Sequence, residues 1–192
     1  NSLGYTLWER VGFTAGERQI AREGRFFEVF LKHYVVAGAT LAFRSELRDM
    51  LLPIPPDWHY DAWLAAVLAA TRKGGMVDAP MQDYRQHVAN VIGGARRGLL
   101  SEARAALALD RSAYYGEEIA RWSQLAERLV FVGASAENRN LLDEKIAHLK
   151  RRAAFPRRRL ARLSAIAAEI RQGGYRRFAR NWGHVVLDLL GT

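Results

Sequence analysis

The residues best able to do chemistry are concentrated in the range 57–93. They are His59, Asp61, Arg85, Gln86 and His87. A carboxylate in the first turn of a helix interacts favourably with the exposed backbone N–H groups there, and an ionised aspartate is what a general base must be. The same position also suits a helix cap, and spacing alone favours Asp61 as the cap of a helix over residues 62–72.

Four short motifs accompany Asp61 in a fixed order between residues 34 and 95. They are Gly38, Thr40, Phe43 and Arg44; Asp61 and Trp63; Asp78, Pro80, Tyr84, Arg85, Gln86 and His87; and Asn90 and Gly93. In this order and spacing they resemble the C-terminal half of bacterial family 2 glycosyltransferases. These are the rhamnosyltransferase-like enzymes that build cell-surface polysaccharides such as O-antigen. Each motif alone is weak, so the order of all four carries the resemblance.

The resemblance assigns roles to the matching residues. Asp61 takes the position of the catalytic base, which deprotonates an acceptor hydroxyl so that it attacks the anomeric carbon of a nucleotide-sugar, with rhamnose as the sugar typical of the family. The donor diphosphate and its divalent metal, Mg²⁺ or Mn²⁺, are expected near Arg85, Gln86 and His87, with His87 closest to the metal. The acceptor, a glycan or a polyprenyl-linked sugar, is expected beside Gly38, Thr40, Arg44, Trp63 and Tyr84.

Structural explanations for several of these residues remain open. His87 could be a hydrogen-bonded core histidine, Gly38 could serve close packing, and Trp63 could fill the core, which is the usual fate of a helical tryptophan. The family usually places its histidine directly before the aspartate, whereas Tyr60 separates His59 from Asp61 here. No role is therefore carried over to His59.

The nucleotide-binding half of such an enzyme is not represented in the sequence. The family places an Asp-x-Asp motif ahead of the acceptor half, because two carboxylates suit a hard divalent cation. The 192 residues contain neither this motif nor a Gly-rich phosphate loop, and the chain begins at Asn1 rather than Met. We therefore expect the acceptor half of an active site that does not turn over alone and does not bind a nucleoside diphosphate with Mn²⁺ at micromolar concentration.

Composition limits the class of protein. Hydrophobic residues make up 49% of the chain and aromatic residues 10%, which is enough for a packed core. The absence of cysteine excludes disulfides and thiolate metal sites. We find no apolar run long enough for a membrane span and no leader segment. A cytoplasmic protein, held peripherally on the inner face of the bacterial cytoplasmic membrane, is the expectation.

Positive charge is concentrated in one segment. Between residues 150 and 180 there are eleven Lys or Arg and a single acid, Glu169, so this segment accounts for the net charge of +9. Such a segment attracts an anionic membrane or nucleic acid. The residues expected at that surface are Arg157, Arg158, Arg159, Tyr175, Arg176, Arg177 and Arg180. The ending of the chain also resembles the tail of the same enzymes, although a solvated cationic face with inward aromatics explains the composition equally well.

The periodicity of apolar residues predicts the elements that position these groups. Helices are expected at 15–33, 45–51, 61–73, 99–109, 117–130 and 137–152 and from 156 onward, the last with Leu160, Leu163, Ile166, Ala167 and Ile170 as its core stripe. Extended segments are expected at 34–43, 76–79 and 84–87. The predicted fold is mainly α with a few short strands. Residues 1–97 form the acceptor-side part of a GT-A-like α/β domain, and residues 98–192 form a helical bundle.

Two non-enzymatic hypotheses remain beside the glycosyltransferase. The first is a basic α-helical module that grips nucleic acid or an anionic membrane through residues 150–180, although no recognised nucleic-acid motif is present. The second is a scaffold bundle that assembles with a partner glycosyltransferase.

Overall fold

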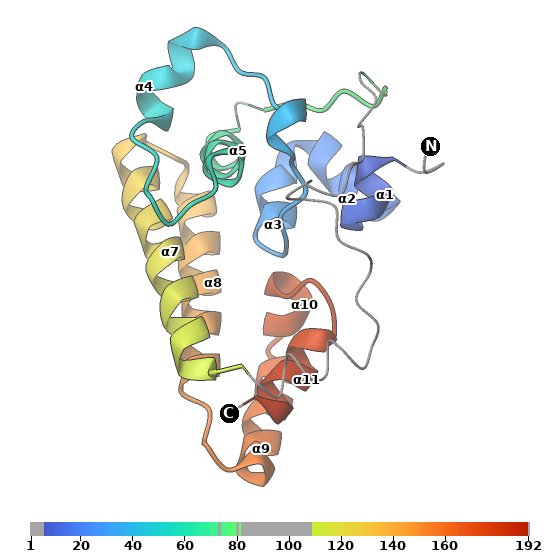
Figure 1. Cartoon of the computed structure of the whole chain (residues 1–192), viewed down its shortest axis with the longest axis vertical. Coiled ribbons are helices and arrows are strands. Elements are labelled where there is room, and N and C mark those ends of the chain that lie inside the picture. The colour runs from blue at the N-terminus through green and yellow to red at the C-terminus, as the bar shows by residue number, and fades with distance from the viewer. Residues whose placement is uncertain (1–5, 73, 80, 82–108, 192) are drawn as a thin grey trace, which may run out of the picture.

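The computed structural model describes residues 6–72, 74–79, 81 and 109–191, and within them all regular structure is helical (Figure 1). The mainly α class is therefore confirmed for these residues. The helices are α1 (Leu7–Val11), α2 (Ala15–Ile20), α3 (Phe26–Phe30), α4 (Arg48–Leu51), α5 (Tyr60–Ala70), α7 (Arg111–Phe131), α8 (Ala136–Ala153), α9 (Arg159–Arg171), α10 (Gly174–Phe178) and α11 (Gly183–Leu190). The other helical turns are the π-helix η1 (Ala21–Arg25) and the 3₁₀-helices η2 (Gly38–Thr40) and η3 (Ser45–Leu47).

The strand predicted at 34–43 is wrong. Ala37 and Leu41 have extended backbone angles, but the 3₁₀-helix η2 separates them and no strand forms in the described residues. An extended segment becomes a strand only when a neighbouring segment supplies its hydrogen-bond ladder. The second predicted extended piece, 76–79, also forms no strand, and the third, 84–87, lies outside the described residues.

The helix predicted at 15–33 is three consecutive helical pieces. Thr14 and Glu17 form a capping box at the start of α2, in which each side chain bonds the other residue's backbone N–H. Gly24 then adopts φ 80°, a left-handed conformation that interrupts the regular helix within η1. After it, α3 turns Phe27 and Phe30 into the core.

Helix α5 lies in the centre of the upper part of the molecule, where Figure 1 views it end-on. Nine of its eleven residues are buried, and five of the eleven are alanines. Small side chains allow neighbouring helices to approach on several sides, and α5 contacts α3, α4 and α7. The rings of Trp58, Trp63 and Trp122 pack edge-to-face with centroids 5.5 and 5.7 Å apart and join α5 to α7.

Helices α7 and α8 form a long antiparallel hairpin along one side of the molecule (Figure 1). Asp110 caps α7, Ser135 caps α8, and Gly133 at φ 67° makes the turn between them. The predicted helices 117–130 and 137–152 are confirmed, although α7 starts earlier, at Arg111. The predicted helix 99–109 falls outside the described residues, apart from Leu109.

The predicted core stripe of α9 is also wrong. Only Ile166 of its members is buried, while Leu160 is 83% exposed and Leu163 49% exposed. The face of α9 that packs against α10 and α11 carries Arg162 and Glu169 beside Ile166. Two charged side chains point inward here because backbone carbonyls bind Arg162, and His148 and Arg151 bind Glu169. The periodicity of apolar residues does not reveal such partners.

Candidate acceptor site around Asp61

Asp61 links two of the motifs that carry the family resemblance. Its Oδ2 accepts a hydrogen bond of 2.9 Å from the backbone N–H of Gly38, 23 positions earlier in the chain. Its Oδ1 accepts one of 2.9 Å from the N–H of Ala62. The side chain is only 8% exposed. The start of α5 and the 3₁₀-helix η2 are thus joined through one carboxylate.

Asp61 is not the N-cap of α5. The helix begins at Tyr60, so His59 is the N-cap residue, and its side chain makes no capping hydrogen bond. Asp61 is the second residue of the first turn, where a negative charge interacts favourably with the helix dipole. Asp61 is therefore not the N-cap residue, although its Oδ1 accepts the N–H of Ala62 in the first turn.

Tyr34 and Tyr60 surround this carboxylate. The Tyr34 hydroxyl is buried and makes no hydrogen bond of normal geometry within the described residues. Burial, and then the neighbouring Asp61 carboxylate, raise the pKa of Tyr34 far above its usual range. Tyr60 is 57% exposed, and its ring lies against Gly38, where an added Cβ would stand 1.9 Å from the hydroxyl oxygen. Packing against Tyr60 thus explains Gly38.

The other predicted acceptor residues separate into two groups. Thr40 and Arg44 are exposed on the segment that follows Gly38, with the Thr40 hydroxyl bonded to the Ala37 carbonyl. Trp63 is 1% exposed and donates its indole N–H to the Leu51 carbonyl at 2.8 Å. A sugar has no access to that ring, so the assignment of Trp63 to acceptor binding is corrected to a core role.

The predicted donor side lies outside the described residues. It comprises Arg85, Gln86 and His87, including the metal role of His87. Tyr84, which is predicted to bind the acceptor, also lies outside the described residues, and the approach of all four to Asp61 stays a prediction. Among the described residues, no three His, Asp or Glu side chains are grouped so that they could hold a metal ion.

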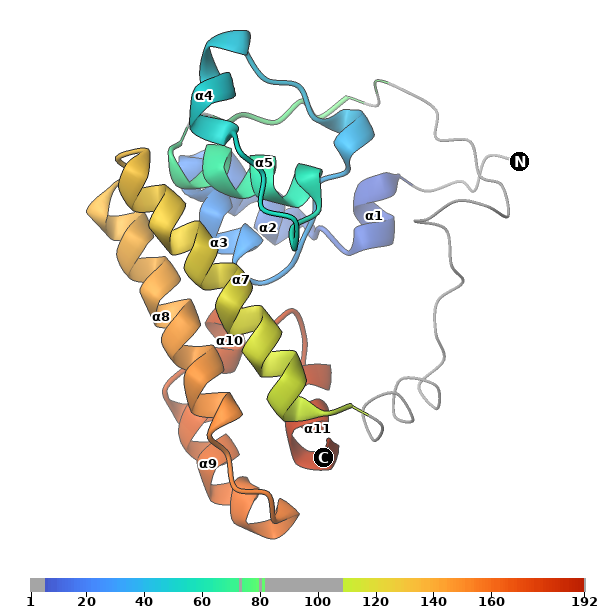
Figure 2. The ribbon, with the colours of Figure 1, turned by 60° about the vertical axis from the view of Figure 1, so that its left-hand side comes forward.

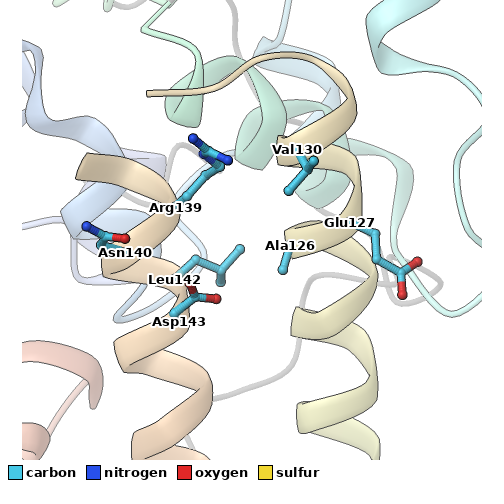
Figure 3. Close-up of a pocket in the computed structure, with 7 residues that line it drawn as sticks. All are labelled: Ala126, Glu127, Val130, Arg139, Asn140, Leu142 and Asp143. Carbon is cyan, nitrogen blue, oxygen red and sulfur yellow. The ribbon is translucent and has the colours of Figure 1, made fainter. Parts of the chain in front are cut away.

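A groove lies elsewhere in the described residues, between α7 and α8 (Figure 3). It has a volume of about 400 Å³ and is lined by Ala126, Glu127, Val130, Arg139, Asn140, Leu142 and Asp143. Leu142 points across it toward Ala126, while Glu127 points away. This lining includes none of the residues around Asp61, so we assign no acceptor to the groove.

The predicted cationic surface is partly corrected. The six arginines at 157, 158, 159, 176, 177 and 180 are exposed. Tyr175, however, is 4% exposed and donates its hydroxyl to Asp188 at 2.6 Å, so it faces the interior rather than a membrane. Arg177 pairs with Glu144, and Arg180 bonds the Val11 carbonyl. No helix in the described part of the chain combines the length and apolar character needed to cross a bilayer.

A buried polar cluster in the C-terminal helices escaped the sequence analysis. Asp188, fully buried, accepts hydrogen bonds from Tyr115, Tyr175 and Arg152, the last at 2.6 Å. On α8, Lys145, His148 and Arg152 share the buried face with leucines. Their spacing of three and four residues among Leu142 and Leu149 is the signal that could have revealed them.

Comparisons of the chain with protein-family models, with functionally characterised proteins and with solved structures gave no match.

Proposed function

We propose that this chain forms the acceptor-binding half of an inverting glycosyltransferase site, with Asp61 as the general base. The observation that carries the proposal is the hydrogen bond between the Gly38 N–H and the Asp61 carboxylate. Its two partners belong to separate motifs of the family resemblance.

The Asp61 carboxylate keeps acceptor positions beyond its two backbone hydrogen bonds. Each oxygen accepts one backbone N–H, and a carboxylate oxygen has two acceptor positions. The two N–H groups fix the orientation of Asp61, which positions its remaining acceptor sites. An acceptor hydroxyl donates to Asp61, loses its proton to it, and attacks the anomeric carbon from the face opposite the leaving nucleoside diphosphate. The sugar–phosphate bond breaks as the new glycosidic bond forms, so the anomeric configuration inverts.

Tyr60 takes the stacking role that Trp63 is unable to perform. Its ring is exposed, directly precedes Asp61 in the chain and lies against the Gly38 backbone. Aromatic faces are suitable surfaces for the apolar side of a sugar ring. The exposed Thr40 and Arg44, which follow Gly38, supply polar groups for the sugar hydroxyls.

The experiment measures sugar transfer by the polypeptide expressed from its complete reading frame. The protein is incubated with UDP-, GDP- and dTDP-sugars and a lipid extract of the cell envelope as acceptor. Release of nucleoside diphosphate is followed, and the anomeric configuration of the product is read from its proton NMR coupling constants. We expect acceptor-dependent release and an inverted product. A product that retains the donor configuration would contradict a mechanism with a single base.

A further inference from the structure

Helix α9 presents apolar side chains to solvent and charged side chains to the protein. Leu160, Leu163 and Ile170 are 83%, 49% and 38% exposed, whereas Arg162 and Glu169 are each 2% exposed. With Ala167, the three exposed residues fall within an arc of about 80° on a helix that turns 100° per residue. The stripe is therefore one continuous helix face without a protein partner among the described residues.

The inward-facing charged side chains of α9 are already hydrogen-bonded, so a small rotation of the helix would not bury the stripe. Arg162 donates to the carbonyls of Pro156, Arg157 and Gly191 at 2.6, 2.7 and 2.5 Å. Glu169 accepts from both His148 and Arg151. Rotating α9 to bury its leucines would break these bonds and expose two charges that are already paired.

In the segment 157–171, the exposed charges beside the stripe are all positive. Arg157 and Arg158 precede Leu160, and Arg171 ends the helix; all three are exposed and none pairs with a carboxylate of the described residues. Glu169, the one acid between residues 150 and 180, is buried on the opposite face. Both ribbon views place α9 at the lower end of the long axis, away from α4 and α5 (Figures 1 and 2).

We propose that α9 lies flat on an anionic phospholipid surface, with Leu160, Leu163 and Ile170 inserted among the acyl chains and Arg157, Arg158 and Arg171 at the phosphate groups. An in-plane helix of this kind needs an apolar face and flanking cations, and both are present. Nucleic acid would satisfy the arginines but would leave the leucines in water. A second copy would bring two arginine-rich faces together. The inference does not depend on the proposed sugar transfer.

The first experiment measures binding to vesicles. The protein is floated with phosphatidylcholine vesicles that contain or lack phosphatidylglycerol. We expect binding to the anionic vesicles only. Binding should be weaker at about 1 M salt than at about 0.1 M, because the higher salt concentration screens the charges more strongly. The double variant L160Q/L163Q should lower the partition coefficient about tenfold or more. The matched control V130Q/F131Q removes two exposed apolar side chains from α7 (63% and 77% exposed) and should bind like the wild type.

A second comparison of two double variants tests the contribution of the arginines to vesicle binding. R157Q/R158Q and R48Q/R139Q remove the same charge from exposed positions, the first pair beside the stripe and the second on α4 and α8. We expect a loss of anionic-vesicle binding for the first pair several times larger than for the second. Equal losses for the two pairs, or full binding by L160Q/L163Q, would reduce the interaction to non-specific charge attraction and overturn the proposal.

The second experiment reports on insertion directly and does not depend on the stability of the polar variants. Because the chain contains no cysteine, L160C and V130C each provide a single labelling site for an environment-sensitive fluorophore. On anionic vesicles the emission of the label at position 160 should shift to the blue, and that at position 130 should stay unchanged. Tighter binding to duplex DNA than to vesicles at equal salt, or a leucine-dependent dimer that ignores vesicles, would refute the proposal.

Discussion

Lys145 offers a quantitative test of the packing in the C-terminal helices. Its side chain is 6% exposed, its ammonium nitrogen donates to the Phe178 carbonyl at 2.7 Å, and it lies 5.4 Å from the centroid of the Trp122 ring. No carboxylate in the described part of the chain pairs with it. Burial lowers the pKa of Lys145 to about 7, from 10.5 for an unburied lysine. Replacing it with methionine, which is similar in length and uncharged, should therefore stabilise the protein at neutral pH.

The size of the effect follows from proton linkage. The lowering of the Lys145 pKa from 10.5 to about 7 corresponds to a destabilisation of the folded protein by about 5 kcal/mol, at about 1.4 kcal/mol per pKa unit. Lys145→Met also leaves the Phe178 carbonyl without its donor, which costs about 1–3 kcal/mol. The net gain in the free energy of unfolding at pH 7 should be about 2–4 kcal/mol.

The pH dependence of the free energy of unfolding tests the lowered pKa of Lys145 independently. Between pH 7 and 10.5 the unfolded chain holds a proton on Lys145 that the folded protein has released. Stability of the wild type therefore rises with pH in this window, by at most about 1.4 kcal/mol per unit from this residue. The variant should lack this contribution.

The assay is urea denaturation followed by circular dichroism at several pH values from about 7.5 to 9.5, within the window of the linkage. Lys150→Met is the matched control, because Lys150 is exposed near the end of the same helix. It should leave both the stability at pH 7 and the slope nearly unchanged. A Lys145→Met protein that is less stable than the wild type at pH 7 and keeps the wild-type slope would refute the reasoning.

Two further predictions concern the same region. A Cβ on Gly174 would stand 2.1 Å from a Glu169 carboxylate oxygen and 2.6 Å from a His148 nitrogen, so Gly174→Ala should cost about 1–3 kcal/mol in urea denaturation. Gly116→Ala, which meets nothing within 4 Å inside α7, should instead stabilise by about 0.5–1 kcal/mol, and the reverse order of the two variants would contradict the packing. Burial lowers the pKa of His148 to about 4, so its contribution to stability, about 3 kcal/mol, is present above pH 6.5 and is lost as the pH falls toward 4. His148→Gln should weaken that acid dependence in pH-resolved melts, and an unchanged profile would count against a buried neutral imidazole.

The sequence predicted the long helices best. The helices predicted at 117–130 and 137–152 form as α7 and α8, because the stripe of Leu125 and Leu129, the glycine at 133 and the leucines of α8 are local signals that agree with one another. The strand at 34–43 failed because β structure depends on a partner segment that the sequence window does not contain. The central helix predicted at 61–73 forms as α5, although it begins at Tyr60 and already ends at Ala70, with Thr71 as its C-cap.

Helix α9 shows why periodicity alone misleads. Its apolar stripe predicted a buried face, but the carbonyls around Arg162 and the His148 and Arg151 partners of Glu169 decide which face turns inward. These partners come from other elements, so no window over α9 contains them. The contact of Asp61 with Gly38 was likewise out of reach of spacing, and only the order of motifs suggested that the two segments belong together.

The account depends most on Asp61, and the rate of sugar transfer by Asp61→Asn tests it most directly. The amide keeps the size of the side chain and an oxygen for the Gly38 N–H but is not a base. In the protein from the complete reading frame we expect a loss of about 10²–10⁴ in kcat with the donor KM nearly unchanged. Asp57→Asn, which alters an exposed carboxylate four positions earlier, should keep full activity. Wild-type turnover by Asp61→Asn would contradict the proposed function.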